Sequence, residues 1–291
     1  MVEARAAEFV DAHGITIVYD VYEAVGIARG AVQLLHGVGE HAGRYGAVIE
    51  ALTRDGFHVY ADDHRGHGRT GIRQHGGPAG LGRLGRGGLG AAVDACWQLT
   101  GIIRDEQADL PLVLLGHSWG SFLAQKLLNQ HPEAYDAVVL TGSAYLTPTH
   151  LNAAPLNARW AGPDAHGLEW LSRDPAVWQA FREDPLTTET QLLKLFGPIE
   201  AAKLYGRPAR DLSSRGGHSV PVLLMVGRDD PVGGPRSVHK LADAYRNRSG
   251  LADVTTLVYP DARHELFHEL QADAVRADLL AWLDARIPAR G

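Results

Sequence analysis

One pentapeptide has the residue types and the spacing for nucleophilic catalysis. Gly116-His117-Ser118-Trp119-Gly120 follows an apolar run at residues 113–115 and precedes the opening of a helical pattern. A serine in a strained strand-to-helix turn needs small residues two positions before and after it, because larger side chains would collide. The alternative is an ordinary turn with a capping serine. The strand before the motif and the helix after it favour Ser118 as a nucleophile that attacks a carbonyl carbon.

A serine hydroxyl at neutral pH needs a base, and the base needs a carboxylate that orients it. The chain order serine, acid, histidine is typical of the fold in which this turn occurs. Asp230 comes just after a late apolar run, and His264 comes just after the last one. Because parallel strands end at one edge of a sheet, we expect both residues to lie beside Ser118.

Two neighbours compete for these roles. Asp229 directly precedes Asp230 and is either the acid or a turn residue, and His268 lies one helical turn beyond His264. We favour His264 as the base, because His268 falls where a helix is expected to have begun, whereas Asp229 and Asp230 both stay candidates for the acid at this point.

Charge that develops on the attacked carbonyl oxygen needs two converging N–H donors. Trp119 directly follows the nucleophile, and Val38 lies in the small-residue loop after the strand that ends near His36; these two are the expected donors. His36, His64 and His67 also cluster in loops. We interpret them as structural residues that bond backbone groups, and we expect no metal site.

The elements that position these residues alternate in type. An early antiparallel strand or hairpin is expected at residues 15–22, and further strands are expected at 31–36, 57–61, 113–115, 137–141, 220–226 and 253–259, with helical patterns between most of them. This alternation predicts an α/β fold with a mostly parallel sheet that helices cover on both faces. The glycine-rich residues 71–90 could be mistaken for a phosphate-binding loop, but they lack its motif. We therefore expect a mobile surface loop.

The alternation stops between residues 147 and 215, where apolar residues follow a helical spacing. We therefore expect a core at 1–146, a helical cap at 147–215 and the rest of the core at 216–291. About half of the cap's apolar residues are expected to pack into a small core of their own. The others are candidates to line a pocket for an apolar substrate group.

Composition narrows the class of protein. The chain has 291 residues, a formal net charge of −6 and a single cysteine, Cys96. The charge argues against a nucleic-acid partner, and one cysteine excludes an internal disulfide. No apolar run is long enough for a membrane span, and the acidic N-terminal residues do not resemble a signal peptide, so a cytoplasmic location is expected.

Four blocks, residues 36–45, 63–70, 116–120 and 227–231, resemble signature segments of the monoacylglycerol lipase and lysophospholipase-like branch of the α/β-hydrolases. Residues 171–175 and 181–186 are similar to the cap segment of that branch. The resemblance covers nearly the whole chain. It implies an α/β-hydrolase fold with Ser118 as nucleophile, Asp230 as acid, His264 as base, and Val38 and Trp119 as oxyanion donors. The branch usually has Met at the position of Trp119, which leaves the acyl-chain preference open.

The resemblance implies a cofactor-free serine hydrolase for carboxylic esters, with a monoacylglycerol or a related lipid or small ester as substrate. The same residues would also support opening of a lactone or acyl transfer to an alcohol or amine. A ligand-binding protein without turnover is the alternative from another class, and the presence of all three residues in order argues against it. Transient contact of the apolar cap with a membrane is expected, whereas the sequence indicates no oligomeric state.

Overall fold

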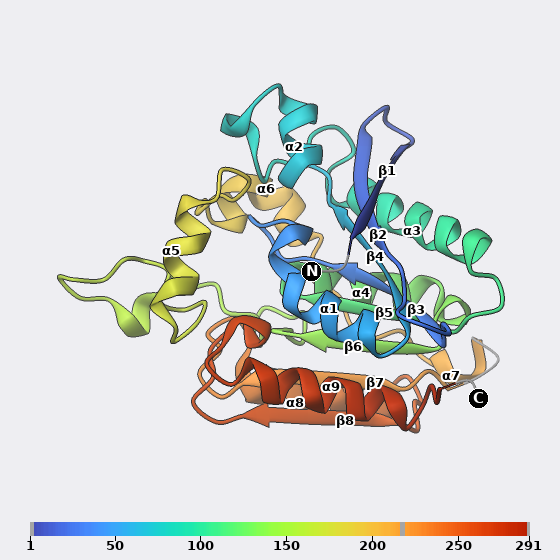
Figure 1. Ribbon diagram of the computed structural model, residues 1–291. Helices are drawn as coiled ribbons and strands as arrows, with labels where there is room; N and C mark the ends of the chain where they lie inside the picture. Colours follow the sequence, from blue (N-terminus) through green and yellow to red (C-terminus); the bar gives the residue numbers. More distant parts are fainter. Residues whose placement is uncertain (1–2, 216–218, 290–291) are drawn as a thin grey trace.

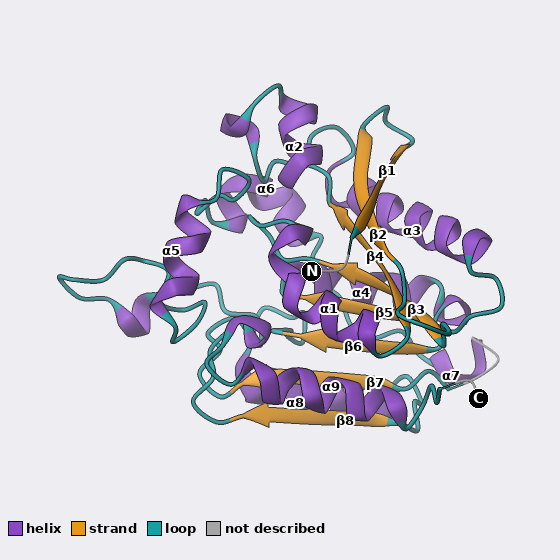
Figure 2. Cartoon of the chain, viewed as in Figure 1, coloured by secondary structure: helices purple, strands orange, loops and turns teal. Residues whose placement is uncertain are grey.

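The computed structural model describes residues 3–215 and 219–289, and these residues form one eight-stranded sheet with helices on both faces (Figures 1 and 2). The strand order is β1-β2-β4-β3-β5-β6-β7-β8. The pairs β1–β2 and β2–β4 are antiparallel, and the other neighbours are parallel. The strands are β1 (Ala4–Val10), β2 (Thr16–Tyr22), β3 (Gly30–Leu35), β4 (Phe57–Asp63), β5 (Leu112–His117), β6 (Ala137–Thr141), β7 (Val222–Gly227) and β8 (Val254–Tyr259).

Two groups of helices cover the two faces. Apolar side chains of α1 and α9 pack on one face, and those of α3, α4 and α8 pack on the other. The helices of the described residues are α1 (Gly46–Arg54), α2 (Gly68–His75), α3 (Gly88–Glu106), α4 (Trp119–Gln130), α5 (Pro175–Glu183), α6 (Leu192–Ala202), α7 (Leu212–Arg215), α8 (Gly234–Asn247) and α9 (Ala272–Asp284).

Strand β5 shows why an unbroken apolar run forms a central strand here. Successive side chains of a strand point to opposite faces, so a strand covered on both sides is apolar at every position. Leu112 and Leu114 pack with α3 and α4, whereas Val113 and Leu115 pack with α1 and α9. All four are buried. The predicted doubly covered, mostly parallel sheet is confirmed.

One strand is not predicted from the sequence, and one sequence expectation is wrong. The sheet has a further strand at its edge, β1, whose alanine-rich sequence is largely exposed. The glycine-rich residues 71–90 are not one open loop, because α2 ends within them and α3 begins there. Glycine serves close packing at Gly71, where a Cβ atom would lie 2.5 Å from the carbonyl carbon of Gly66. Leu81 and Leu84 of this segment are buried.

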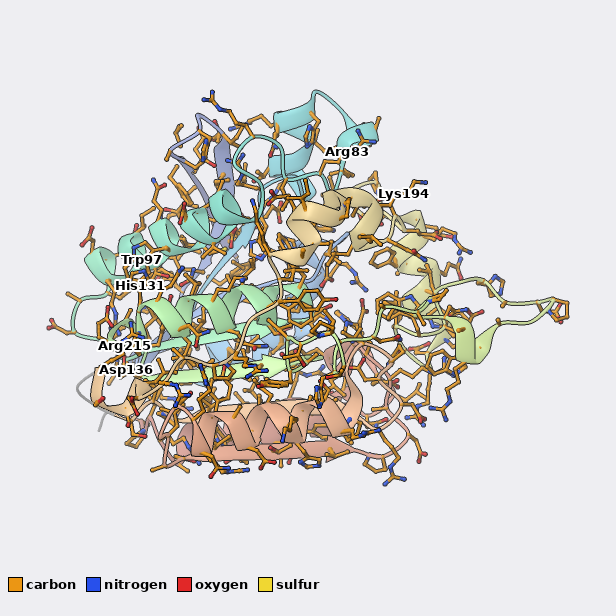
Figure 3. All side chains as sticks on the ribbon, turned by 180° about the vertical axis from the view of Figure 1, so that it is seen from behind. Arg83, Trp97, His131, Asp136, Lys194 and Arg215 are labelled. Atoms are coloured by element: carbon orange, nitrogen blue, oxygen red, sulfur yellow. The ribbon has the colours of Figure 1, made fainter. Side chains whose placement is uncertain are left out.

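Between β6 and β7, the described residues form helices and loops and no strand. Part of this insertion has its own apolar cluster, which contains Leu168, Leu171 and Phe181. Helix α6 instead lies against the glycine-rich segment, as Arg83 and Lys194 mark in Figure 3. There the Glu200 carboxylate accepts a hydrogen bond from the Leu89 N–H at 2.8 Å. Residue 216, where the sequence predicts that the core resumes, lies outside the described residues.

The insertion is thus anchored at several points on the core. None of the described helices is long and apolar enough to cross a membrane.

Candidate active site

Ser118 stands in the sharp turn between β5 and α4. Its backbone has φ 51° and ψ −123°, a region that a residue with a side chain rarely adopts. A Cβ atom at Gly116 would lie 2.6 Å from the carbonyl oxygen of Gly120, and one at Gly120 would lie 2.5 Å from that of His36. The two glycines therefore allow the turn, whose strain costs about 1–3 kcal/mol. Strain of this kind is typical of functional sites.

His264 and Asp230 form a hydrogen-bonded chain with Ser118. The Nε2 atom of His264 lies 2.8 Å from Ser118 Oγ, and its Nδ1 atom lies 3.0 Å from Asp230 Oδ1. The same carboxylate oxygen accepts the N–H of Val232 at 2.8 Å, which fixes the orientation of Asp230. All three members of the chain follow the carboxyl ends of parallel strands. Ser118 has an exposed fraction of 9%, and the other two side chains are buried.

The two competing residues lie elsewhere. Asp229 Oδ1 is 2.5 Å from the guanidinium of Arg159, at a partly exposed position. The Nε2 atom of His268 lies 2.8 Å from the carbonyl oxygen of Arg44. Neither residue is hydrogen-bonded to Ser118 or to its partners in the described structure.

The electrostatic surroundings distinguish His264 from its neighbour His117. Burial alone would lower the pKa of His264, but the carboxylates of Asp230, Glu265 and Glu40 together outweigh burial and raise the pKa above its ordinary value. His117 lies at the end of β5 with its ring centroid 4.9 Å from that of His264. Burial lowers the pKa of His117 well below the usual range, and the nearby His264 lowers it further. His264 is thus the more basic of the two imidazoles, and its Nε2 atom is the one that lies beside Ser118 Oγ.

The loop after β3 approaches Ser118 closely. A Cβ atom at Gly37 would lie 3.2 Å from the Cβ of Ser118. The Gly37 N–H donates to Glu40 Oε1 at 2.6 Å, and the Gly37 carbonyl oxygen lies 2.7 Å from His36 Nδ1. The Gly37 carbonyl contact orients the peptide plane that carries the Val38 N–H, since the N–H of a trans peptide points away from its C=O, and the Glu40 contact holds the peptide before it.

The Trp119 N–H belongs to the first turn of α4, where backbone N–H groups have no intrahelical acceptor. Neither this N–H nor that of Val38 donates to another group in the described part of the chain. Both predicted oxyanion donors therefore lie in segments next to Ser118 and have free hydrogen-bonding capacity in the described structure.

The indole of Trp119 is fully buried between the core and the insertion. Its ring stacks on His67 at a centroid distance of 5.0 Å and contacts Phe196 of α6 edge-on at 5.2 Å. His36 accepts the backbone N–H of His64 at 3.0 Å, and His67 Nδ1 lies 2.8 Å from the Arg65 carbonyl oxygen. The prediction that these histidines bond backbone groups agrees with the contacts of the His36 and His67 rings, whereas it is wrong for His64, whose ring bonds the Asp62 carboxylate instead.

One buried group near this cluster has metal-ligand character. Donor atoms of Asp62, His64 and Cys96 lie within 4.8 Å of one another. His64 Nδ1 is 2.7 Å from Asp62 Oδ2, so a proton already joins the two. Burial and the Asp62 charge raise the pKa of Cys96 well above its ordinary value, which disfavours the thiolate that a metal would need. We interpret the group as a hydrogen-bonded cluster.

The insertion contributes contacts that the sequence did not predict. The Trp170 ring lies 5.0 Å from the His264 ring, and the Thr188 N–H donates to the Gly39 carbonyl oxygen at 2.8 Å. His41 Nε2 lies 2.8 Å from Asp184 Oδ2. No local pattern indicates these pairs, because their members lie far apart in the sequence.

Comparison with known proteins bears on the same residues. The family model for serine aminopeptidase, S33, matches residues 26–271, a span that contains the whole Ser118–His264–Asp230 chain. The chain belongs to this family.

Relatives and solved structures of the family match along nearly their whole length. A monoacylglycerol lipase of Mycolicibacterium smegmatis is 32% identical over 97% of this chain and 99% of its own length. A monoglyceride lipase of Mus musculus is 26% identical over 97% of this chain and 91% of its own. A carboxyl esterase of Bacillus coagulans, 23% identical, shares the fold with a TM-score of 0.84 over 99% of this chain and 100% of its own. The S33 protein described here is thus an α/β-hydrolase of the monoacylglycerol lipase-like branch and a carboxylic ester hydrolase.

Proposed function

We propose that this S33 hydrolase cleaves esters of apolar acyl groups, monoacylglycerols or related lipid or small esters, through an acyl-enzyme on Ser118. The observation that carries the proposal is the unbroken chain Ser118 Oγ–His264–Asp230, with contacts of 2.8 and 3.0 Å at a strained turn. The names of the relatives, monoacylglycerol lipase and monoglyceride lipase, support the substrate class.

In the first half-reaction His264 Nε2 takes the proton of Ser118 as Oγ attacks the ester carbonyl carbon. The N–H groups of Val38 and Trp119 donate hydrogen bonds to the negatively charged carbonyl oxygen. Each donor contributes about 3–4 kcal/mol of transition-state stabilisation. As the tetrahedral intermediate collapses, the carbon–oxygen bond to the alcohol breaks. His264 gives its proton to the departing alkoxide, and the acyl group remains on Ser118.

In the second half-reaction water attacks the acyl-enzyme. His264 takes a proton from the water, and Asp230 stabilises the imidazolium that forms. The carbon–Oγ bond breaks, His264 returns the proton to Ser118, and the carboxylic acid leaves.

We also propose that residues 147–215 act as a cap over this site. The contacts of Trp170 with His264 and of Phe196 with Trp119 support that assignment. Leu193 and Ile199 on α6 expose 60% and 75% of their surface, as expected of a cap that meets a lipid surface transiently.

The test is hydrolysis of monoacylglycerols, lysophospholipids and a chain-length series of p-nitrophenyl esters, with and without an added alcohol acceptor. Ser118→Ala is the blank. The exposed Ser214, whose hydroxyl donates to the Asp211 carbonyl oxygen, provides the matched control Ser214→Ala. We expect release of free acid from monoacylglycerols that Ser118→Ala abolishes and Ser214→Ala leaves unchanged. Ser118-independent hydrolysis, or activity only in the presence of the acceptor, contradicts the proposal.

A further inference from the structure

A chain of buried ion pairs joins the loop of Val38 to the loop of His264. The Arg44 guanidinium pairs with Glu40 on one side. On the other side its two terminal nitrogens lie 2.8 and 2.7 Å from the two carboxylate oxygens of Glu265. Exposed fractions of the Arg44, Glu40 and Glu265 side chains are 9%, 3% and 3%. Glu265 directly follows His264, so one guanidinium ties the segment after β8 to the segment after β3.

Glu40 connects Arg44 to the loop after β3 that carries Val38. Its Oε1 atom accepts the Gly37 N–H at 2.6 Å and the Tyr45 hydroxyl at 2.6 Å. The Gly37 N–H belongs to the peptide just before the Gly37–Val38 peptide, and Gly37 joins that peptide to the one that carries the Val38 N–H. A shift of Glu40 would therefore move that donor relative to Ser118.

The buried ion pairs of Arg44 with Glu40 and Glu265 are an unfavourable way to stabilise the fold alone. Burying two carboxylates and a guanidinium costs several kcal/mol of desolvation per ion, and apolar side chains of similar volume often stabilise a protein as well or better. A bidentate arginine–carboxylate pair, however, fixes distance and angle more tightly than apolar packing does. The Phe181 ring of α5 lies 4.8 Å from the Arg44 guanidinium carbon and helps to exclude water.

We propose that Arg44 is a positioning residue that holds the Val38 N–H and His264 in register with Ser118 through Glu40 and Glu265. The inference rests on the proposed function and adds to it the residues that align the two halves of the site. Arg44 contacts neither Ser118 nor His264 by hydrogen bond in the described structure, so its effect on catalysis passes through its two carboxylate partners.

The same carboxylates act on His264 electrostatically. The charged and titratable groups that face His264 are Asp230 after β7, His117 at the end of β5, Glu40 after β3 and Glu265 beside it. Burial lowers the pKa of His264, whereas Asp230, then Glu265 and Glu40, raise it. Neutralising Glu265 removes one of the raising charges and leaves the positive charge of Arg44 less compensated. Both changes lower the pKa of His264.

Two variants test the proposal in the full-length protein. Arg44→Lys keeps the charge but loses the planar fork, and Glu265→Gln keeps the shape but loses the charge. Arg286→Lys is the matched control, because Arg286 also forms a bidentate pair, with Asp253 at 2.8 Å on both contacts, away from the site.

We expect Arg44→Lys to lower kcat about 10- to 100-fold with KM changed less than threefold, because a misplacement of about 1 Å costs that much in rate. Glu265→Gln should move the acid limb of the kcat/KM profile toward lower pH, because the substitution removes one of the charges that raise the pKa of His264. If Arg44→Lys does not fold, the pH profile of kcat/KM of Glu265→Gln still tests the proposal.

Wild-type kcat in folded Arg44→Lys, an unshifted acid limb in Glu265→Gln, or an equal loss of kcat in Arg286→Lys would overturn the proposal. Failure of the proposed function is distinguishable, because the wild-type protein itself would then show no Ser118-dependent hydrolysis.

Discussion

The choice between Asp230 and Asp229 yields the sharpest quantitative prediction. Both hydrogen bonds to Asp230, from Val232 N–H and His264 Nδ1, end on the same oxygen, Oδ1. The amide oxygen of Asp230→Asn can accept both, so the substitution keeps the geometry and removes the charge. An imidazolium 3.0 Å from a carboxylate gains about 5 kcal/mol at an effective dielectric constant of about 20.

A loss of about 5 kcal/mol corresponds to roughly 10³–10⁴ in rate. The same change in a serine protease triad costs about 10⁴ in kcat with the geometry intact, there because the imidazole takes the wrong tautomer. We therefore expect Asp230→Asn to lower kcat about 10³-fold or more, with active sites counted by phosphonate titration of folded protein. Asp229→Asn breaks a pair with the largely exposed Arg159 and should change kcat less than about threefold. The reasoning is refuted if Asp230→Asn stays within tenfold of wild type, or if Asp229→Asn loses as much.

Three further predictions concern backbone crowding, proton transfer and acyl-chain preference. Gly120→Ala should lower the free energy of unfolding by about 1–3 kcal/mol and reduce kcat, since its Cβ would meet the His36 carbonyl. Gly101→Ala in α3 has open space and should raise stability by up to about 1 kcal/mol in the same urea titration. Because only neutral His264 accepts a proton, kcat/KM should rise with pH through the raised His264 pKa, with a midpoint above about 6.5; a midpoint below that value contradicts the assignment. Trp119→Met loses no hydrogen bond in the described structure and opens space beside Phe196. The ratio of kcat/KM for long acyl esters to kcat/KM for short ones should therefore rise about tenfold. An unchanged ratio in the p-nitrophenyl ester series would contradict a role of Trp119 in acyl-chain selection.

The sequence predicts the central part of the fold well because its signals are local. Four-to-seven-residue apolar runs with helical patterns between them specify buried parallel strands. The flanking glycines at 116 and 120 specify the turn. Position after a strand then selects His264 among the histidines, and the structure places it 2.8 Å from Ser118.

Features that depend on tertiary packing cannot be predicted from the sequence alone. Strand β1 pairs with β2 through its backbone, so its alanine-rich side chains carry little strand signal. Helix α2 contains glycine, which usually disfavours a helix, yet Gly71 packs against the Gly66 carbonyl.

The same limit applies around the active site. Arg44 and Glu265 are 221 positions apart in the chain, and only the fold brings them together. The Glu40–Arg44 spacing of four residues is the one local hint of the ion-pair chain.

The most direct test of the central claim is phosphonylation of the protein with a fluorophosphonate probe, read by intact mass and peptide mapping. We expect one adduct per chain, on Ser118, with loss of ester hydrolysis in proportion to labelling. Ser118→Ala should remain unlabelled and His264→Ala should label far more slowly. Labelling at another residue, or full hydrolysis by the phosphonylated protein, would contradict an acyl-enzyme on Ser118.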